Sequence, residues 1–220
     1  MNGIFITGTD TDVGKTWVGQ HLISALGQNK MNVIPRKPVE SGWDDDNIES
    51  TDAWKLAQAA NQLAALDIIC PNRFSHAISP ARAAALEGKS LTIEMLKKQC
   101  LDGIKQDSFL YVEGAGGFYS PLCNNGLNAD LATALALPVL LVAENRLGCI
   151  NQVLLNVEAF KKSGIALKAI VLNDVSGDKL GEMNNSNDLK DMLDYPIFTT
   201  QYKQASSDTF EKLAQLVSCE

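Results

Sequence analysis

The sequence predicts an α/β fold with a mainly parallel sheet and helices on both faces. Short apolar runs alternate along the chain with segments of helical periodicity, and this alternation implies right-handed crossovers between parallel strands. The chain has 220 residues, of which 45% are hydrophobic, and this suits one domain with a substantial core. We therefore expect a single domain spanning residues 1–220.

The predicted strands are short, continuous and rich in Ile, Val and Leu, as are strands buried on both faces of a sheet. They cover residues 4–7, 33–36, 68–70, 110–113, 139–142 and 169–172. In such sheets ligands bind beyond the carboxyl ends of the strands. Functional residues are therefore expected directly after these runs.

Helical periodicity is found between and after these strands. Apolar residues recur on one helical face within residues 18–26, 93–104, 150–160 and 210–217, which predicts helices that pack on the sheet. Two polar segments, residues 43–50 and 176–187, are expected to be loops.

The first predicted strand is followed by a near match to the phosphate-binding loop, at residues 8–16. Five residues rather than four separate Gly8 from Gly14, and Thr9 stands where Gly is usual. Backbone N–H groups of such a loop bind phosphate oxygens, Lys15 would reach the β and γ phosphates, and the Thr16 hydroxyl would bind Mg²⁺. The loop predicts a P-loop NTPase-like fold. The expected nucleotide contacts here are Asp12, Val13, Gly14, Lys15, Thr16 and Trp17.

Charged residues follow two other predicted strands. Glu113 ends an apolar run and precedes a glycine-rich turn; a carboxylate there, beside a phosphate loop, is a natural ligand for the Mg²⁺ of a nucleotide. Lys37 follows the second strand. Taken alone, Lys37 is best interpreted as a solvated lysine. The alternative, functional interpretation is that it is a second cation on the transferring phosphate. We expect Lys15 and Lys37 to lie at exposed strand–loop edges. Asp52 by itself resembles an acid favoured by a helix dipole.

Composition argues against several classes of function. The net charge of −7 disfavours nucleic acid and an anionic membrane surface as partners. A signal peptide and a membrane span are not apparent, so a cytoplasmic protein is expected. The five cysteines lack a CxxC pair, which disfavours a disulfide framework or a zinc knuckle. Neither His21 nor His76 has a nucleophile motif beside it, so no catalytic triad is expected.

Together, these segments resemble the dethiobiotin synthetase family. The matching segments are residues 8–16, 37–42, Asp52, 112–117, 147–151 and 172–174, so the resemblance covers about residues 1–175. The long phosphate loop is itself the family's form. Two segments depart from the family: residues 79–82 lack its usual His, and its C-terminal base-binding segment has only residues 195–200 as a candidate. Base specificity is therefore left open.

The resemblance implies an ATP-dependent cyclo-ligase of biotin biosynthesis. Such an enzyme forms the ureido ring of dethiobiotin from 7,8-diaminononanoate, CO₂ and ATP, through carbamate and carbamic-phosphate intermediates. Phosphoryl transfer depends mainly on positioning and charge neutralisation. Lys15 and Lys37 are therefore the implied catalytic residues, and Thr16, Asp52 and Glu113 the implied ligands of Mg²⁺.

The resemblance also implies the remaining contacts and a homodimer. Thr11 and Ser41 would contact the substrate, and Gly114, Ala115 and Gly116 would lie along nucleotide or substrate. Asn173 and Asp174 would bind the nucleotide, Asn173 reading the adenine. In the family the substrate carboxylate is bound by a helix start from the second subunit, which here corresponds to Gly148, Cys149, Ile150 and Asn151.

Two alternatives remain open. A related P-loop amidoligase, such as a cobyrinic acid diamide synthase, often carries a glutaminase domain for which 220 residues leave no room. A regulatory or partitioning P-loop ATPase usually has a second lysine early in its phosphate loop, where this chain has Thr9, Asp10, Thr11 and Asp12. A GTPase would need an Asn-Lys-x-Asp motif, which residues 173–175 do not supply.

Overall fold

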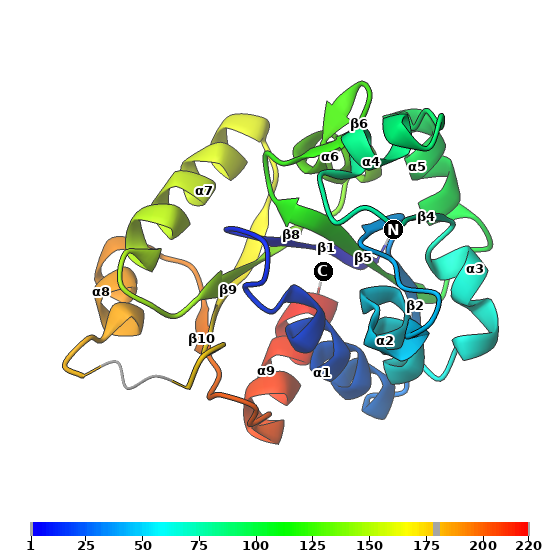
Figure 1. The fold of residues 1–220 in the computed structure, drawn as a ribbon. Helices are drawn as coiled ribbons and strands as arrows, with labels where there is room; N and C mark the ends of the chain where they lie inside the picture. Colours follow the sequence, from blue (N-terminus) through cyan, green and yellow to red (C-terminus); the bar gives the residue numbers. More distant parts are fainter. Residues whose placement is uncertain (1, 178–180, 220) are drawn as a thin grey trace.

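A six-stranded parallel sheet forms the centre of the computed structural model, which describes residues 2–177 and 181–219 (Figure 1). The strand order is β10-β9-β8-β1-β5-β2, and each neighbouring pair is parallel. The strands are β1 (Gly3–Gly8), β2 (Asn32–Arg36), β5 (Ser108–Gly117), β8 (Val139–Glu144), β9 (Leu167–Asn173) and β10 (Ile197–Thr199). The predicted parallel sheet is confirmed.

Two small sheets lie outside this core. β3 (Val39–Ser41) pairs in parallel with β4 (Asn72–Phe74), and β6 (Pro121–Cys123) pairs with β7 (Gly126–Leu127) in the antiparallel sense. β3 follows β2 after only two residues, Lys37 and Pro38. The chain that leaves the carboxyl end of β2 therefore runs directly into β3.

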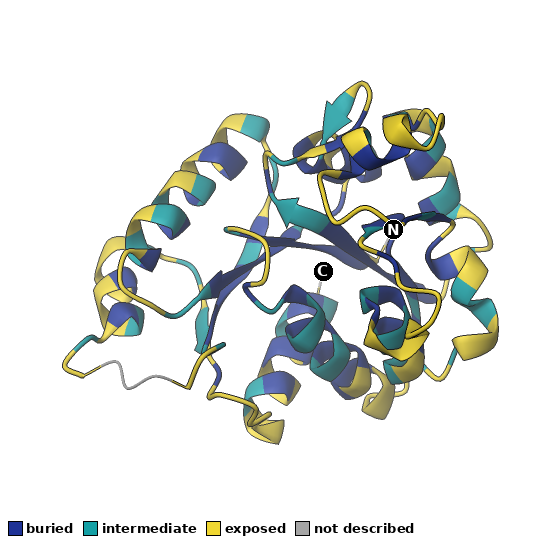
Figure 2. Cartoon of the chain, viewed as in Figure 1, coloured by how far each residue is buried: buried dark blue, intermediate teal, exposed yellow. Residues whose placement is uncertain are grey.

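Helices cover both faces of the sheet (Figure 1). Ile4 and Ile6 of β1 share a buried cluster with residues of α1, α2 and α9, whereas Phe5 belongs to the cluster under α4, α5, α6 and α7. This alternation follows from the period of two along a strand. Figure 2 shows the sheet buried between the two helical layers. The helices are α1 (Lys15–Gln28), α2 (Asp52–Ala59), α3 (Leu66–Ile69), α4 (Pro80–Leu86), α5 (Ile93–Leu101), α6 (Asn128–Leu135), α7 (Cys149–Ser163), α8 (Asn185–Met192) and α9 (Ser207–Ser218).

The four segments of helical periodicity lie in α1, α5, α7 and α9. Their apolar faces pack on the sheet as predicted. The first and last of them contact each other on one face, where Trp17 of α1 meets Phe210 of α9 with ring centroids 5.8 Å apart. These helical predictions are confirmed, although α5 ends before the last residues of its predicted segment.

The predicted strand at residues 68–70 is wrong, because this run ends the short helix α3. Ile69 and Cys70 are buried in a side cluster with Trp43 and Ala53, but Ile68 is 52% exposed. A strand covered on both faces would bury all of these residues. A second difference is β10, a three-residue strand at the edge of the sheet that was not predicted.

The two polar segments are largely loops. Residues 43–50 contain a 3₁₀ turn at Ile48–Ser50, and Trp43 at their start is buried. Within residues 176–187, α8 already begins at Asn185, and residues 178–180 lie outside the described part of the chain. Among the described helices, none is long and apolar enough to cross a membrane.

Candidate active site

The phosphate loop connects β1 to α1 at the carboxyl edge of the sheet. Gly14 has a φ of +86°, a conformation that favours glycine. A Cβ there would also collide with the Asn173 amide. Because Gly14 has no side chain to cap α1, the first N–H groups of that helix are available to a phosphate.

A cavity of about 320 Å³ opens beside this loop. Its walls come from the phosphate loop, the segment after β2, the start of α2 and the end of β5. The lining residues are Thr11, Asp12, Gly14, Lys15, Thr16, Lys37, Glu40, Ser41, Asp52, Ala115 and Gly116. The cavity lining thus holds about half of the predicted nucleotide, substrate and metal contacts, together with the predicted catalytic Lys37, and it adds Glu40.

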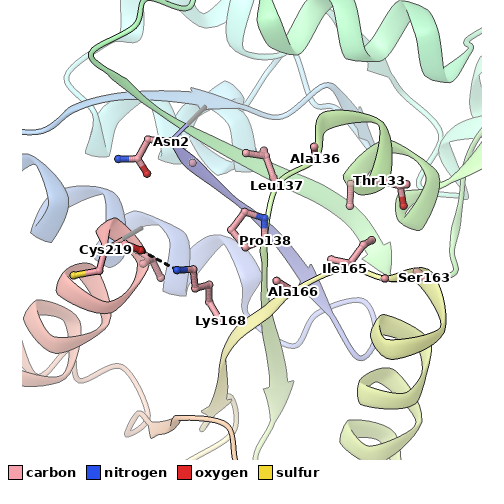
Figure 3. Close-up of a pocket in the computed structure, with 14 residues that line it drawn as sticks. Asn2, Thr133, Ala136, Leu137, Pro138, Ser163, Ile165, Ala166, Lys168 and Cys219 are labelled. Atoms are coloured by element: carbon pink, nitrogen blue, oxygen red, sulfur yellow. Dashed lines mark hydrogen bonds between the residues drawn. The ribbon is translucent and has the colours of Figure 1, made fainter.

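A larger cavity of about 550 Å³ lies at the opposite edge of the sheet (Figure 3). It is lined by the starts of β1, β8 and β9 and by helix ends, and the predicted site residues are absent from its lining. Its one lysine, Lys168, donates a hydrogen bond to the Cys219 carbonyl at 2.8 Å. The phosphate loop and the charged groups therefore favour the smaller cavity as the active site.

A buried charge cluster forms the floor of the candidate site. The Nζ atom of Lys37 lies 2.7 Å from Glu113 Oε1 and 3.0 Å from Asp52 Oδ2, and it donates to the Gly114 carbonyl at 3.2 Å. The Thr16 hydroxyl donates to the same Glu113 oxygen at 2.8 Å. The predicted convergence of Thr16, Asp52 and Glu113 is therefore observed, and Lys37 lies between the two carboxylates.

The expectation that both lysines are exposed is wrong. Lys15 is 7% exposed and Lys37 is 3% exposed. Lys15 donates from Nζ to the Asp10 carbonyl at 2.9 Å, back across its own loop. Lys37 is enclosed between Asp52 at the start of α2 and Glu113 of β5, and these two carboxylates offset the cost of burying its charge.

The two lysines differ in their electrostatic surroundings. Burial, followed by the nearby charge of Lys37, lowers the pKa of Lys15. Burial also acts to lower the pKa of Lys37, but Asp52, Glu113 and Glu40 outweigh it and raise that pKa above its ordinary value. Lys37 is therefore firmly cationic, whereas Lys15 has no directly bonded carboxylate among the described residues and gains from an anionic ligand.

The donor set at the cavity fits Mg²⁺. It consists of a threonine hydroxyl and two carboxylates, which are hard oxygen ligands. Burial acts to raise the pKa of Asp52, but the nearby charge of Lys37 and the hydrogen bond that Lys37 donates outweigh it and lower that pKa, so Asp52 is ionised. Clusters of three or more His, Cys, Asp or Glu are not found among the described residues. A set of one hydroxyl and two carboxylates suits Mg²⁺, which takes its other ligands from phosphates and water.

Several predicted contacts lie outside the cavity lining. Gly148 and Asn151 are exposed at the start of α7, Cys149 is buried and Ile150 is half-buried. Asn173 is buried and its amide is engaged: Nδ2 donates to the Val13 carbonyl at 3.0 Å, and Oδ1 accepts from Thr200 at 2.6 Å.

Two other predicted nucleotide contacts are also held by neighbouring groups. Asp174 accepts hydrogen bonds from the backbone N–H groups of Gly177 and Tyr202. Trp17 packs edge-on against His21 and Phe210 between α1 and α9.

Three supporting residues were not predicted from the sequence. The carboxylate of Glu40 accepts hydrogen bonds from the first N–H groups of α2. The Tyr111 hydroxyl donates to Glu113 Oε2 at 3.0 Å. Asn128 donates to the Ala115 and Gly117 carbonyls and fixes the glycine-rich turn. Glu40 and Asn128 bond to groups 11 to 13 positions away along the chain, whereas Tyr111 lies only two positions before Glu113 on the same strand.

Comparison with known proteins supports the same assignment. A family model described as an AAA domain matches residues 2–201. An ATP-dependent dethiobiotin synthetase of Anaeromyxobacter dehalogenans (strain 2CP-1) is 40% identical over 173 residues, which cover 79% of this chain and 77% of that protein. The corresponding protein of Ruthia magnifica is 36% identical over 199 residues, which cover 90% of each chain.

Solved structures resemble the chain in fold. The septum site-determining protein MinD from Pyrococcus horikoshii, complexed with Mg-ADP, aligns with a TM-score of 0.57 at 18% identity and covers 99% of this chain and 96% of that one. The cell division ATPase MinD from Pyrococcus furiosus gives 0.52 at 16% identity, with coverage of 99% and 98%. These likenesses confirm the predicted P-loop NTPase-like fold. Sequence identity over most of the chain goes further, and it establishes that the chain belongs to the ATP-dependent dethiobiotin synthetase family.

Proposed function

We propose that this chain closes the ureido ring of dethiobiotin from 7,8-diaminononanoate, CO₂ and ATP. The observation that carries this proposal is the position of Lys37 in the cavity. It is a permanent cation held between Asp52 and Glu113, in a cavity that it shares with Lys15 of the phosphate loop and with Ser41. A reaction that forms an anionic carbamate and then phosphorylates it needs two cations at one point.

The steps of this reaction assign separate tasks to several residues of the cavity. One amine of the substrate takes up CO₂ as a carbamate, whose oxygen attacks the γ-phosphate of ATP and releases ADP. The second amine attacks the carbonyl carbon of the carbamic phosphate and expels phosphate as the ring closes. Lys15 and the N–H groups of α1 bind the phosphates, and Lys37 stabilises the carbamate and the transferring phosphoryl group. Thr11 and Ser41, which line the cavity, would contact the diamine.

Mg²⁺ is part of this proposal. Thr16, Asp52 and Glu113 would hold it, and when bound it would neutralise charge on the β and γ phosphates. Ala115 and Gly116 border the same space at the end of β5, where a ligand can approach the backbone closely, and Gly114 is buried just before them.

A homodimer completes the proposed site. The start of α7 is not part of the cavity lining of its own chain, and its exposed Leu147, Gly148 and Asn151 are free to meet another molecule. The substrate carries amines at one end and a carboxylate at the other. If the amines lie at Lys37, the N–H groups of a partner's α7 would bind the distant carboxylate.

The test of this function is phosphate release by the purified protein. ATP alone should give little phosphate, and adding 7,8-diaminononanoate with bicarbonate should raise the rate strongly, with dethiobiotin detected as product. ATP hydrolysis that is substantial and unchanged by the diamine would instead support a regulatory ATPase.

A further inference from the structure

Glu40 is a buried carboxylate in the cavity wall, at the middle of the short strand β3. It is 7% exposed, and its two oxygens accept hydrogen bonds from the backbone N–H groups of Asp52 at 2.7 Å and Ala53 at 2.9 Å. Within the described residues Glu40 forms no ion pair. Its position therefore depends on these two bonds and on the strand that carries it.

The bonds from Glu40 fix the start of α2, and a separate residue supports the next N–H group. Thr51, the residue before the helix, accepts from the Trp54 N–H at 3.3 Å. The first turn of α2 thus has two independent acceptors. Thr51 belongs to the chain that enters the helix, whereas Glu40 belongs to the strand that follows Lys37.

Because Thr51 and Glu40 belong to different segments, their hydrogen bonds to α2 have different effects on the site. Glu40 lies three positions after Lys37, and Asp52 contacts Lys37 through its side chain at 3.0 Å. The Glu40 bonds therefore close a ring that runs from Lys37 through Glu40 to the Asp52 backbone and returns through the Asp52 carboxylate. The Thr51 bond is local to the helix and does not enter this ring.

We infer that Glu40 is a positioning residue that holds Asp52 in register with Thr16, Lys37 and Glu113 for binding the magnesium–nucleotide complex. The inference rests on the proposed function, in which Asp52 is a ligand of Mg²⁺. Residues that orient metal ligands commonly contribute a factor of about 10–100 to metal affinity.

The test compares Glu40→Ala, Glu40→Gln and Thr51→Ala with the parent protein. The probe is the non-hydrolysable analogue adenosine 5′-(β,γ-methylene)triphosphate, and its affinity is measured by calorimetry in Mg²⁺ and in EDTA. Glu40→Ala should reduce the gain in affinity that Mg²⁺ provides by about 10–100-fold. In EDTA its affinity should match that of the parent, because Lys15 and the phosphate loop are unchanged. Glu40→Gln keeps one acceptor oxygen and should lose less.

Thr51→Ala separates this role from ordinary helix capping. Both alanine variants remove acceptors at the start of α2 and should lower the melting temperature, but only Glu40→Ala should weaken the Mg²⁺ effect. If Glu40→Ala retains the full Mg²⁺ effect, or if Thr51→Ala loses as much, the positioning role is overturned. If Glu40→Ala does not fold, Glu40→Gln decides in the same way, because a full Mg²⁺ effect in that variant also overturns the role.

Failure of the inference can be told apart from failure of the proposed function. The binding test contains no diamine, so it does not depend on the identity of the acid or amine substrate. Asp52→Asn serves as the reference in the same titration. Loss of the Mg²⁺ effect in Asp52→Asn but not in either Glu40 variant overturns only the positioning role. Retention of the effect in all three variants overturns that role and also removes Asp52 from the proposed metal site.

Discussion

At the scale of single residues, the two lysines of the site have different bonding partners, and this predicts different consequences of removing them. Lys37 is the shared partner of two carboxylates, one of which, Glu113, is fully buried. Lys15 bonds to a backbone carbonyl. Removing Lys37 leaves buried negative charge uncompensated, whereas removing Lys15 relieves a buried positive charge.

Lys37→Ala should therefore be much less stable than Lys15→Ala. Breaking a buried ion pair from one side costs about 3–5 kcal/mol, and urea denaturation monitored by tryptophan fluorescence would measure it. Both variants should lose turnover by a factor of about 10²–10³, as expected for the loss of one stabilising donor. Equal unfolding free energies for the two variants would contradict the role of Lys37 as the counter-ion of Glu113.

The sequence predicted the place of candidate site residues in the fold where these residues are consecutive or directly follow a strand. Gly14, Lys15 and Thr16 are of this kind, and so is Glu113 at the end of an apolar run. Their positions follow from the fold class alone. Glu40 was not predicted because its partners on α2 approach it through tertiary packing, and Tyr111 was not predicted because it reads as one more apolar residue of a buried strand. The burial of Lys37 was missed for the same reason as Glu40.

At the scale of elements, α1 packs against β5 through a glycine. A Cβ at Gly19 would overlap the hydroxyl of Tyr111, which donates to Glu113. Gly27, near the end of the same helix, has open space around its Cβ position. Gly19 therefore has no room for a side chain, whereas Gly27 of the same helix does.

Gly19→Ala should destabilise the protein by about 1–3 kcal/mol, because the added methyl group overpacks the interface. Gly27→Ala is the matched control and should stabilise it by about 0.5–1 kcal/mol through a higher helix propensity. Thermal unfolding of both variants measures the difference. A gain in melting temperature for both would mean that α1 shifts away from β5 at little cost.

The packing of α1 on α9 predicts a pH dependence. His21 lies between Trp17 and Phe210, with ring centroids 4.6 and 5.1 Å away, and burial lowers its pKa below the ordinary value of 6.5. Between the lowered pKa and 6.5 the unfolded chain binds more protons, so this contribution to stability is present at higher pH and is lost as pH falls through that window. His21→Gln should lose less stability than the parent between about pH 7.5 and 5.5. Parallel pH profiles of melting temperature for both proteins would contradict this.

Helices and strands were predicted correctly where the hydrophobic pattern extends over many residues. α7 and α9 have several apolar residues on one face, and β8 is a continuous apolar run. The errors of prediction concern short elements. Residues 68–70 are too few to distinguish a strand from the end of a helix, and β10 gains its strand identity from pairing with β9.

At the scale of the whole molecule, the strand order explains which predicted residues meet. β1 and β2 flank β5, so the ends of these three strands bring the phosphate loop, Lys37 and Glu113 to one place. The start of α7 follows β8, on the other side of β1, and it lies outside the cavity lining. A site that uses both the cavity and the start of α7 is therefore best assembled from two chains, which is the proposed homodimer.

This arrangement predicts that two inactive variants restore each other. Lys15→Ala disables its own cavity but leaves no buried carboxylate without its ion-pair partner. It should therefore fold and still present an intact α7. Asn151→Glu keeps its own cavity but places a negative charge where the carboxylate of the substrate would bind. Each homodimer should be inactive in the diamine-dependent phosphate-release assay.

Mixing the two variants under conditions that allow subunit exchange should recover activity. In a hybrid dimer one site combines the cavity of the Asn151→Glu chain with the α7 of the Lys15→Ala chain, and both parts are intact. Statistical exchange makes about half of the dimers hybrid, so about a quarter of all sites should work. A mixture of Lys15→Ala with Lys37→Ala is the control, since both changes disable the cavity and no hybrid restores it. Recovery in the first mixture alone supports a shared site, whereas a parent protein that is monomeric and fully active in the same buffer would rule it out.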